Sequence, residues 1–345
     1  MSKKVLIAMS GGIDSSCAAM KLLNDGYELL GVTLSLYTEN GEFTENKDAK
    51  AVAEKLGFSH ETLEMKEYFC DTVIRDFVES YKKGETPNPC IVCNKKVKFG
   101  KLLEYALEKG CDYLATGHYA QVVKLENGRY ALKKAQDLSK DQTYVLYHLT
   151  QHQLKHLVLP LGNEAKTELR VKAEQAGLVN ANKPDSQDIC FVPDGDYAAF
   201  LKRYTGEDFI PGNMVEKDGT FLAKHEGIEK YTIGQRKGLG VSFGRVRFVV
   251  GKNADRNEIV IGDADDLMKN ELMARDVNFM TVEELTEPMN VLAKTRYSQK
   301  EQPATIYPEG EFVKVVFDEP QRAITPGQAV VFYDGDVLVG GGTII

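Results

Sequence analysis

The sequence predicts an α/β protein in which an N-terminal parallel-sheet domain is followed by two small β-rich domains, the last a β-barrel. Strand-like apolar runs alternate with helical patterns up to about residue 204, which is typical of a parallel sheet. Within this part, an apolar strand leads through two glycines into a helix at residues 4–25. Beyond residue 205, glycine, proline and aspartate separate short apolar runs, which indicates β-strands joined by turns. We therefore expect domains at residues 1–204, 205–268 and 269–345.

The N-terminal elements predict where a ligand would bind. Strands are expected at residues 4–9, 28–36, 60–63 and 113–116, and helices at 13–25, 48–56 and 67–82. Ligands of parallel α/β sheets bind beyond the carboxyl ends of the strands. The stretches that follow these ends are residues 10–15, 34–37 and 116–119. We expect these three stretches to meet at one site.

The C-terminal half carries the strand patterns of the two β-rich domains. Apolar runs recur there at residues 248–250, 259–261, 290–295, 312–317 and 329–333. Turn residues such as Pro326-Gly327 and Asp334-Gly335 stand between them.

The composition restricts the class of protein. The chain has 345 residues, of which 43% are hydrophobic and 27% charged, as in proteins with ordinary buried cores. No apolar run is long enough for a signal peptide or a membrane span, so we expect a cytoplasmic protein without membrane contact. Six cysteines in such a chain indicate catalysis or metal binding more than structural disulfides. The net charge of −8 disfavours a large nucleic-acid surface but leaves room for local lysine clusters.

The most specific feature is the loop between the first strand and the first helix, Ser10-Gly-Gly-Ile-Asp-Ser-Ser16. A glycine turn that opens a helix collects unpaired backbone N–H groups and the positive end of the helix dipole. Such a site binds anions, most often phosphate. Two glycines alone would indicate only an ordinary turn. The longer motif resembles the pyrophosphate loop, or PP-loop, of ATP pyrophosphatases, which split ATP into AMP and pyrophosphate.

A second motif contains paired cysteines, Thr86-Pro-Asn-Pro-Cys90-Ile-Val-Cys93-Asn94. Its prolines predict an irregular loop, and a basic helix is expected after Cys93. A thiol just before a helix N-terminus and near lysines should have a lowered pKa, and therefore more of the reactive thiolate. The alternatives are buried, inert cysteines or one half of a zinc site whose second ligand pair is missing. Cys190, in Asp185-Ser-Gln-Asp-Ile-Cys-Phe191, is a third candidate thiol.

Six motifs in order resemble the tRNA-specific 2-thiouridylase family, MnmA, across the whole chain. They are SGGIDSS, TPNPCIVCNKKVKF, ATGHYA (115–120), KDQTY (140–144), DSQDICF (185–191) and YTIGQRKGLG (231–240). The resemblance implies an ATP- and Mg²⁺-dependent sulfurtransferase that adenylates C2 of uridine 34 in lysine, glutamate and glutamine tRNAs. It also implies a sulfur-carrier or cysteine desulfurase relay protein as partner.

The resemblance also assigns roles to individual residues. Cys93 matches the catalytic nucleophile and Cys190 the persulfide carrier, with a transient Cys93–Cys190 disulfide. Asn88, Pro89 and Cys90 match positions that contact the target base. The ATP positions are Ala8, Met9, Ser10, Gly11, Gly12, Ile13, Asp14, Ser15, Leu34 and Gly117. The tRNA positions are His118, Lys140, Asp141, Gln142, Arg296, Tyr297 and Gln328.

Cys90 departs from the family pattern, which often has aspartate at this position, so the acid–base role of that aspartate cannot be transferred. Three thiols, Cys90, Cys93 and Cys190, could instead hold a [4Fe–4S] cluster with one open iron. The persulfide route and the cluster route are thus alternatives. A further alternative is a PP-loop ligase that acts on a different acceptor.

Two weaker patterns leave alternatives open. Residues 231–240 could form a solvated turn or a loop that covers the site when RNA binds. His148, His152 and His156 have the spacing of one helix face, and this face is expected to be solvated or to contact bases.

Overall fold

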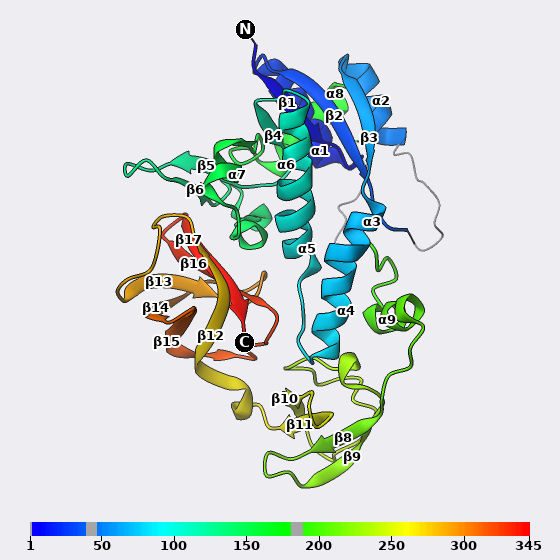
Figure 1. Cartoon of the computed structure of the whole chain (residues 1–345), viewed down its shortest axis with the longest axis vertical. Helices are drawn as coiled ribbons and strands as arrows, with labels where there is room; N and C mark the ends of the chain where they lie inside the picture. The colour runs from blue at the N-terminus through cyan, green and yellow to red at the C-terminus, as the bar shows by residue number, and fades with distance from the viewer. Residues whose placement is uncertain (1, 39–46, 181–188) are drawn as a thin grey trace.

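The computed structural model describes residues 2–38, 47–180 and 189–345. Its first sheet has five parallel strands in the order β3-β2-β1-β4-β7. The strands are β1 Lys4–Ala8, β2 Glu28–Ser35, β3 Ser59–Glu64, β4 Tyr113–Ala115 and β7 Leu157–Val158. This sheet lies at the end of the molecule that also holds the N-terminus (Figure 1).

Helices cover both faces of this sheet, as expected of a parallel α/β domain. On one face, α1 (Ile13–Asn24), α2 (Lys47–Leu56) and α8 (Lys166–Gln175) share an apolar cluster with Val5 and Ile7. On the other face, α6 (Leu102–Glu108) and α7 (Gln151–Lys155) pack with Leu6 and Val32. Alternate side chains of β1 therefore enter opposite cores, because successive residues of a strand face opposite ways.

A helical hairpin connects this sheet to the rest of the molecule (Figure 1). One arm consists of α3 (Lys66–Phe69), the π-helical turn η1 (Cys70–Ile74) and α4 (Arg75–Lys82). The other arm consists of α5 (Pro89–Val92) and the π-helix η2 (Cys93–Lys101), which continues into α6. A further helix, α9 (Tyr197–Thr205), packs against the first arm through Phe200 and Phe77.

The central β-rich unit is a four-stranded sheet in the order β10-β11-β8-β9. The strands are β8 Gly212–Val215, β9 Phe221–His225, β10 Phe248–Asn253 and β11 Glu258–Gly262. They enclose a small cluster of apolar side chains that includes Met214, Ile259 and Ile261.

The C-terminal unit is a closed antiparallel barrel of six strands, because β12 pairs with both β15 and β17. The strands are β12 Met268–Phe279, β13 Met289–Lys294, β14 Gln302–Glu309, β15 Phe312–Arg322, β16 Ala329–Asp334 and β17 Val337–Ile344. The hairpin of β5 (Gln121–Lys124) and β6 (Tyr130–Lys133) extends this sheet through a pair between Lys133 and Val337. The predicted fold class is confirmed.

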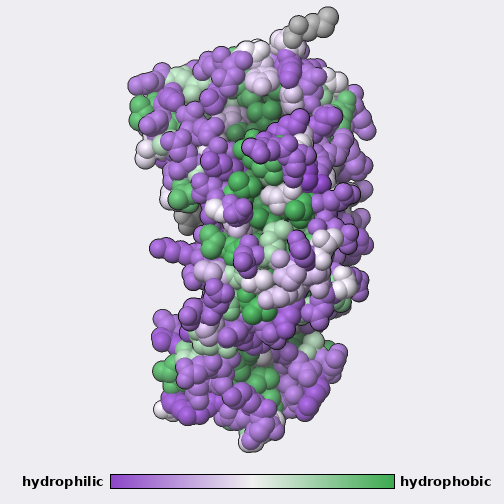
Figure 2. Space-filling view, turned by 90° about the vertical axis from the view of Figure 1, so that its left-hand side faces the viewer, coloured by the Kyte–Doolittle hydropathy of each residue, from purple (hydrophilic) through white to green (hydrophobic). Residues whose placement is uncertain are grey.

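Hydrophilic residues cover most of the face in Figure 2, and apolar residues occur there in small groups. Within the described ranges, no helix has the length and apolar character needed to cross a membrane.

Candidate functional site

The loop after β1 is closed by its own side chains. Gly11 has a φ of 72°, a left-handed conformation that glycine adopts without strain. The Ser15 hydroxyl accepts a hydrogen bond from the Ser10 N–H (3.3 Å) and donates one to the Gly12 carbonyl (3.0 Å). Gly12 then caps α1 without a side chain of its own to accept from the first turn, and its own N–H donates to the Ser10 hydroxyl (3.4 Å). The backbone donors of the first turn are therefore available to an anion, as the sequence predicts.

Asn180 supports this loop from a position 169 residues further along the chain. Its side-chain amide donates to the Gly11 carbonyl (3.0 Å) and to the Ser16 hydroxyl (2.8 Å). The side chain is buried, and its carbonyl oxygen has no partner among the described residues. The sequence did not predict this residue, since no local motif surrounds it.

Asp14 connects the loop to Tyr119, which belongs to the predicted stretch 116–119, and to Lys166, which the sequence did not predict as part of the site. Its carboxylate accepts hydrogen bonds from the Tyr119 hydroxyl (2.8 Å) and from the Lys166 ammonium (2.9 Å). The same ammonium lies 5.6 Å from the centroid of the Tyr119 ring. Lys166 is only 8% exposed, so its positive charge is held close to the anion-binding loop.

Gly117 lies directly against the loop. A Cβ atom at this position would come within 2.8 Å of the Ser15 backbone nitrogen, so a side chain does not fit. Leu34 lies near the carboxyl end of β2 and is half-buried. Among the other predicted ATP positions, Met9 and Ile13 have buried side chains, so their backbone is the part that faces the loop.

Residues 86–88 of the cysteine motif are irregular, as the sequence predicts, but residues 89–94 are helical and not part of the predicted loop. Asn88 caps α5 by accepting a hydrogen bond from the Cys90 N–H (3.1 Å), and Pro89 occupies the first helical position. Proline is well suited to that position, because the N–H it lacks has no partner in a helix. Cys93 therefore lies inside a continuous helix, where η2 begins, and not before its N-terminus.

The prediction of a lowered pKa for Cys93 is wrong. Cys93 is 8% exposed and packs in an apolar cluster with Phe191 and Val97. Burial raises the pKa of its thiol, and the nearby charge of Lys98 only partly offsets this effect. The neighbouring Cys90 raises it further.

Cys190 lies close to the paired cysteines in space, although it is almost 100 positions away in sequence. Cys190 is exposed at the level of the whole residue, but the partial burial of its sulfur raises the pKa of its thiol, and the charges of Cys93 and Cys90 add to the shift. All six cysteines are free thiols in this structure. Cys17 and Cys111 are buried, as predicted for core residues.

Comparison with known proteins identifies the family. Residues 3–194 match the tRNA methyl transferase HUP domain, residues 198–263 the tRNA methyl transferase PRC-barrel domain, and residues 269–344 the aminomethyltransferase beta-barrel domain. The tRNA-specific 2-thiouridylase MnmA of Acetivibrio thermocellus is 50% identical, and the match covers 99% of both chains. The enzyme of the same name from Clostridioides difficile is 50% identical over 100% of this chain and 98% of that one. The chain belongs to the tRNA-specific 2-thiouridylase family.

Two of the positions expected to contact tRNA, Arg296 and Tyr297, make hydrogen bonds between the units of the protein. The Tyr297 hydroxyl donates to the carbonyl of Asp141 (3.0 Å), which joins the barrel to the N-terminal domain. The Arg296 guanidinium donates to the Ile233 carbonyl of the central unit (3.4 Å) and to the Ala323 carbonyl (2.9 Å). Tyr297 is 47% exposed, and its ring packs edge-on against Tyr144, whereas Arg296 is half-buried.

Other predicted tRNA positions of this 2-thiouridylase are held by internal contacts. The Asp141 carboxylate accepts hydrogen bonds from the Ala135 N–H (3.0 Å) and the Thr143 hydroxyl (2.6 Å). The Gln142 side chain accepts from the Tyr119 N–H (2.9 Å), which steadies the partner of Asp14. Lys140 ends a short 3₁₀ helix, Leu138–Lys140. These contacts place Asp141 and Gln142 behind the site as supports.

His118 and His148 both lie in buried surroundings, and His148 differs from what the sequence predicts. The His118 ring lies 2.7 Å from the Thr116 hydroxyl, and burial lowers its pKa well below the usual value. His148 is buried and lies outside α7, so it does not share a solvated helix face with His152 and His156. The shared-face prediction is therefore wrong.

Among the described residues, which include Cys90, Cys93 and Cys190, no group of three or more histidine, cysteine, aspartate or glutamate side chains is arranged to hold a metal ion. Cys90, Cys93 and Cys190 are therefore not arranged around a single metal ion in this conformation. Residues 185–188 of the third motif lie outside the described residues.

Proposed function

We propose that this chain is a tRNA-uridine 2-sulfurtransferase that converts uridine to 2-thiouridine with the consumption of ATP. The proposed target is wobble uridine 34 of lysine, glutamate and glutamine tRNAs, and residues 1–204 form the catalytic domain. One observation carries the proposal: an anion-binding PP-loop and a set of three neighbouring thiols belong to the same domain. ATP would activate the uridine, and the thiols would then transfer sulfur to it.

The PP-loop supports the activation step. The C2 oxygen of uracil attacks the α-phosphate of ATP, and the bond to the β-phosphate bridge oxygen breaks, which gives an adenylated base and pyrophosphate. The predicted ATP positions from Ala8 to Ser15, with Leu34 and Gly117, surround the nucleotide. The N–H groups at the start of α1 and the Lys166 ammonium stabilise the negative charge that develops on the leaving pyrophosphate. Mg²⁺ would enter with the ATP phosphates.

The thiols support the transfer step. A relay protein delivers sulfur to Cys190 as a persulfide, whose terminal sulfur attacks C2 of the adenylated base. The C2–O bond breaks and AMP leaves. Cys93 then attacks the Cys190 sulfur, which frees the thiolated base and leaves a Cys93–Cys190 disulfide. Alternatively, Cys93 first attacks the persulfide on Cys190 and releases sulfide. The sulfide then attacks C2 of the adenylated base. Thiol exchange with an external reductant regenerates both thiols.

The target base must leave the anticodon stack to reach these thiols. Asn88, Pro89 and Cys90 form the turn that would receive it, since they begin the helix that carries Cys93. Tyr297 and Lys140 would contact the RNA around this turn, with His118, Arg296 and Gln328 close by. Asp141 and Gln142 would affect tRNA binding indirectly, because Asp141 holds Tyr297 and Gln142 holds Tyr119 in position.

The cluster route is the second hypothesis for sulfur delivery. The arrangement of Cys90, Cys93 and Cys190 favours the persulfide route, because the three sulfurs are not placed as ligands of one metal group. Iron and acid-labile sulfide are measured on protein purified without oxygen. Stoichiometric iron that is required for activity would refute the persulfide route.

The reaction is tested with purified protein, a tRNA transcript, ATP and a persulfide donor. AMP formation that depends on tRNA, together with 2-thiouridine in the digested RNA, supports the proposal. A PP-loop ligase that acts on another acceptor would form AMP without a thiolated nucleoside, and this result would refute the proposal.

A further inference from the structure

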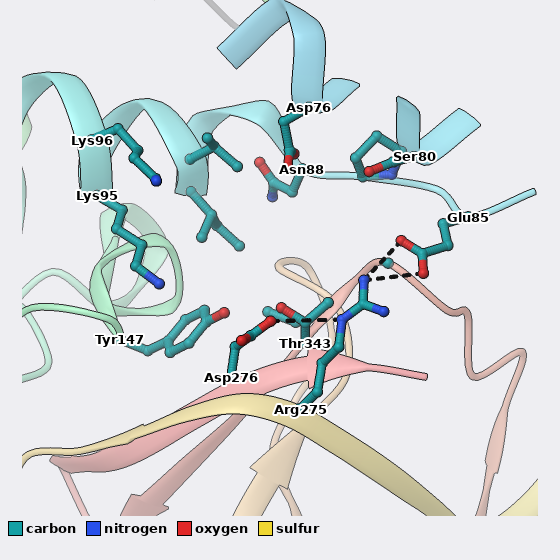
Figure 3. Close-up of a pocket in the computed structure, with 15 residues that line it drawn as sticks. Asp76, Ser80, Glu85, Asn88, Lys95, Lys96, Tyr147, Arg275, Asp276 and Thr343 are labelled. Carbon is teal, nitrogen blue, oxygen red and sulfur yellow. Dashed lines mark hydrogen bonds and ion pairs between the residues drawn. The ribbon is translucent and has the colours of Figure 1, made fainter. Parts of the chain in front are cut away.

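A pocket lies between the cysteine helix and the barrel, on a different face of the helix from Cys93. Cys93 and Val97 pack against Phe191, whereas Ile91, Lys95 and Lys96 line the pocket. Its other walls come from α4 and from the barrel strands β12, β16 and β17 (Figure 3). The pocket volume is about 170 Å³, roughly ten times what a single water molecule needs. It is therefore large enough for a group the size of a nucleobase.

Among the cations that line this pocket, Lys95 and Lys96 form no ion pair within the described ranges. Both are exposed, and their side chains point into the pocket in Figure 3. Neither ammonium has a hydrogen-bond or ion-pair partner within the described ranges. Arg275 differs, because it is paired with Glu85 (3.1 Å) and with Asp276 (3.6 Å).

The pocket combines these two cations with hydrogen-bonding groups. Asp76 and Ser80 of α4 and the Asn88 side chain face the lysines across it (Figure 3). Asp76 feels the charge of Lys96, but no ion pair forms between them. A nucleotide matches this arrangement, because its phosphate is an anion and its base edge carries N–H donors for Asp76 and the Asn88 oxygen. A free phosphate would leave the acceptors unused.

We infer that this pocket binds a nucleotide of the RNA strand next to the target uridine, with its phosphate on Lys95 and Lys96. The inference rests on the proposed tRNA substrate and deepens it. Asn88 connects the two positions, because it lines this pocket and also caps the helix that carries Cys90 and Cys93. The two faces of one helix then hold neighbouring nucleotides of a splayed anticodon loop.

The test measures the affinity for an unmodified lysine tRNA transcript over a range of salt concentrations. Each lost phosphate contact to single-stranded RNA lowers the slope of log K against log salt by about 0.7. We expect Lys95→Ala with Lys96→Ala to lower this slope by about 1.4 and to weaken binding about tenfold. Lys101→Ala is the matched control, because Lys101 lies on the same helix and is paired with Glu104 (2.7 Å).

A second variant tests the pocket itself. Ser80→Phe places a ring in the pocket without a change of charge, and should weaken tRNA binding while ATP binding stays unchanged. In the Lys95→Ala, Lys96→Ala background the same substitution should add little, because the two changes remove one interaction. An unchanged salt slope in the double variant, or an equal loss in Lys101→Ala, would overturn the inference while the proposed function stands. A wild-type protein that does not bind tRNA would overturn both.

Discussion

The side-chain amide of Gln328 donates a 2.7 Å hydrogen bond to the carbonyl of Thr86. A backbone hydrogen bond from the Thr86 N–H to the Pro326 carbonyl (2.9 Å) runs beside it. These bonds fix the barrel to the segment that leads into Asn88 and Cys90. The barrel is therefore part of the structure that positions the cysteine helix, in addition to any contact it makes with tRNA.

This junction predicts a strong effect at Gly327. Its φ is +87°, and a Cβ atom there would lie 2.9 Å from the Thr86 backbone nitrogen. Gly327→Ala should displace the segment before Asn88 and lower thiolation about tenfold or more, with ATP binding retained. Gly335→Ala is the control, because Gly335 also has a positive φ (+55°) but a Cβ atom would meet nothing within 4 Å. Both changes strain the backbone by about 1–2 kcal/mol, so equal activities would contradict the prediction.

The contact between Lys166 and Asp14 predicts a role in activation. Lys166→Ala removes the buried positive charge beside the PP-loop and should lower the rate of tRNA-dependent pyrophosphate release by about 10²-fold. Lys172→Ala, on the same helix, removes a lysine that is paired with Glu164 (3.1 Å) and should leave the rate near that of the wild type. A Lys166→Ala enzyme of normal activity would show that this lysine does not act on the phosphates.

The raised thiol pKa values predict slow alkylation of the free enzyme. The pKa of Cys190 is raised above the reference value of 9.0, so this thiol forms less thiolate at neutral pH than an ordinary thiol. The pKa of Cys93 is raised as well, so both rates should increase as the pH rises through the alkaline range. Peptide mass spectrometry after iodoacetamide treatment measures these rates. Reaction of both thiols at neutral pH as fast as a model thiol would refute the assignment.

The burial of His148 predicts that the folding stability of the protein falls in acid. His148 is buried, both ring nitrogens lack partners among the described residues, and burial with the charge of Lys95 lowers its pKa to about 3. The unfolded chain, with a pKa near 6.5, binds the proton first, so folding stability falls as the pH drops from 6.5 towards 3. At pH 5, this histidine lowers the free energy of unfolding by about 2 kcal/mol relative to its value above pH 6.5.

His148→Leu should therefore flatten the loss of unfolding free energy between pH 6.5 and pH 5 in denaturant titrations. His152→Leu is the control, because His152 is exposed. If His148→Leu had the same pH dependence as the wild type, the buried neutral imidazole would not be the cause.

The sequence predicted those parts of the site that lie within one continuous motif. Glycines and serines at 10–16 indicated the anion-binding turn, because a strand, a tight turn and a helix are local features. Asn180 and Lys166 were not predicted, since they reach the loop from more than 150 positions away and only the folded chain brings them there. Alternation of apolar residues indicated barrel strands, but the pairing of β12 with β17 that closes the barrel is a long-range contact.

For the cysteines, too, the sequence predicted only what depends on neighbouring residues in the chain. Their positions in the motif indicated reactive thiols, and in the structure Cys190 lies near enough to Cys93 for the two thiols to affect each other's charge. The direction of the Cys93 pKa shift depended on Phe191 and other residues that bury the sulfur, which the local sequence does not reveal. The π-helix from Cys93 to Lys101 was also not predicted, although such distortions are frequent at functional sites.

The central claim is that Cys93 and Cys190 deliver sulfur to ATP-activated uridine in tRNA. The most direct measurement is nucleoside mass spectrometry of tRNA from cells that lack this gene and carry the wild type, Cys93→Ser or Cys190→Ser. We expect 2-thiouridine to return with the wild type and to stay absent with either variant. Normal 2-thiouridine in the cells without the gene, or restored by both serine variants, would contradict it.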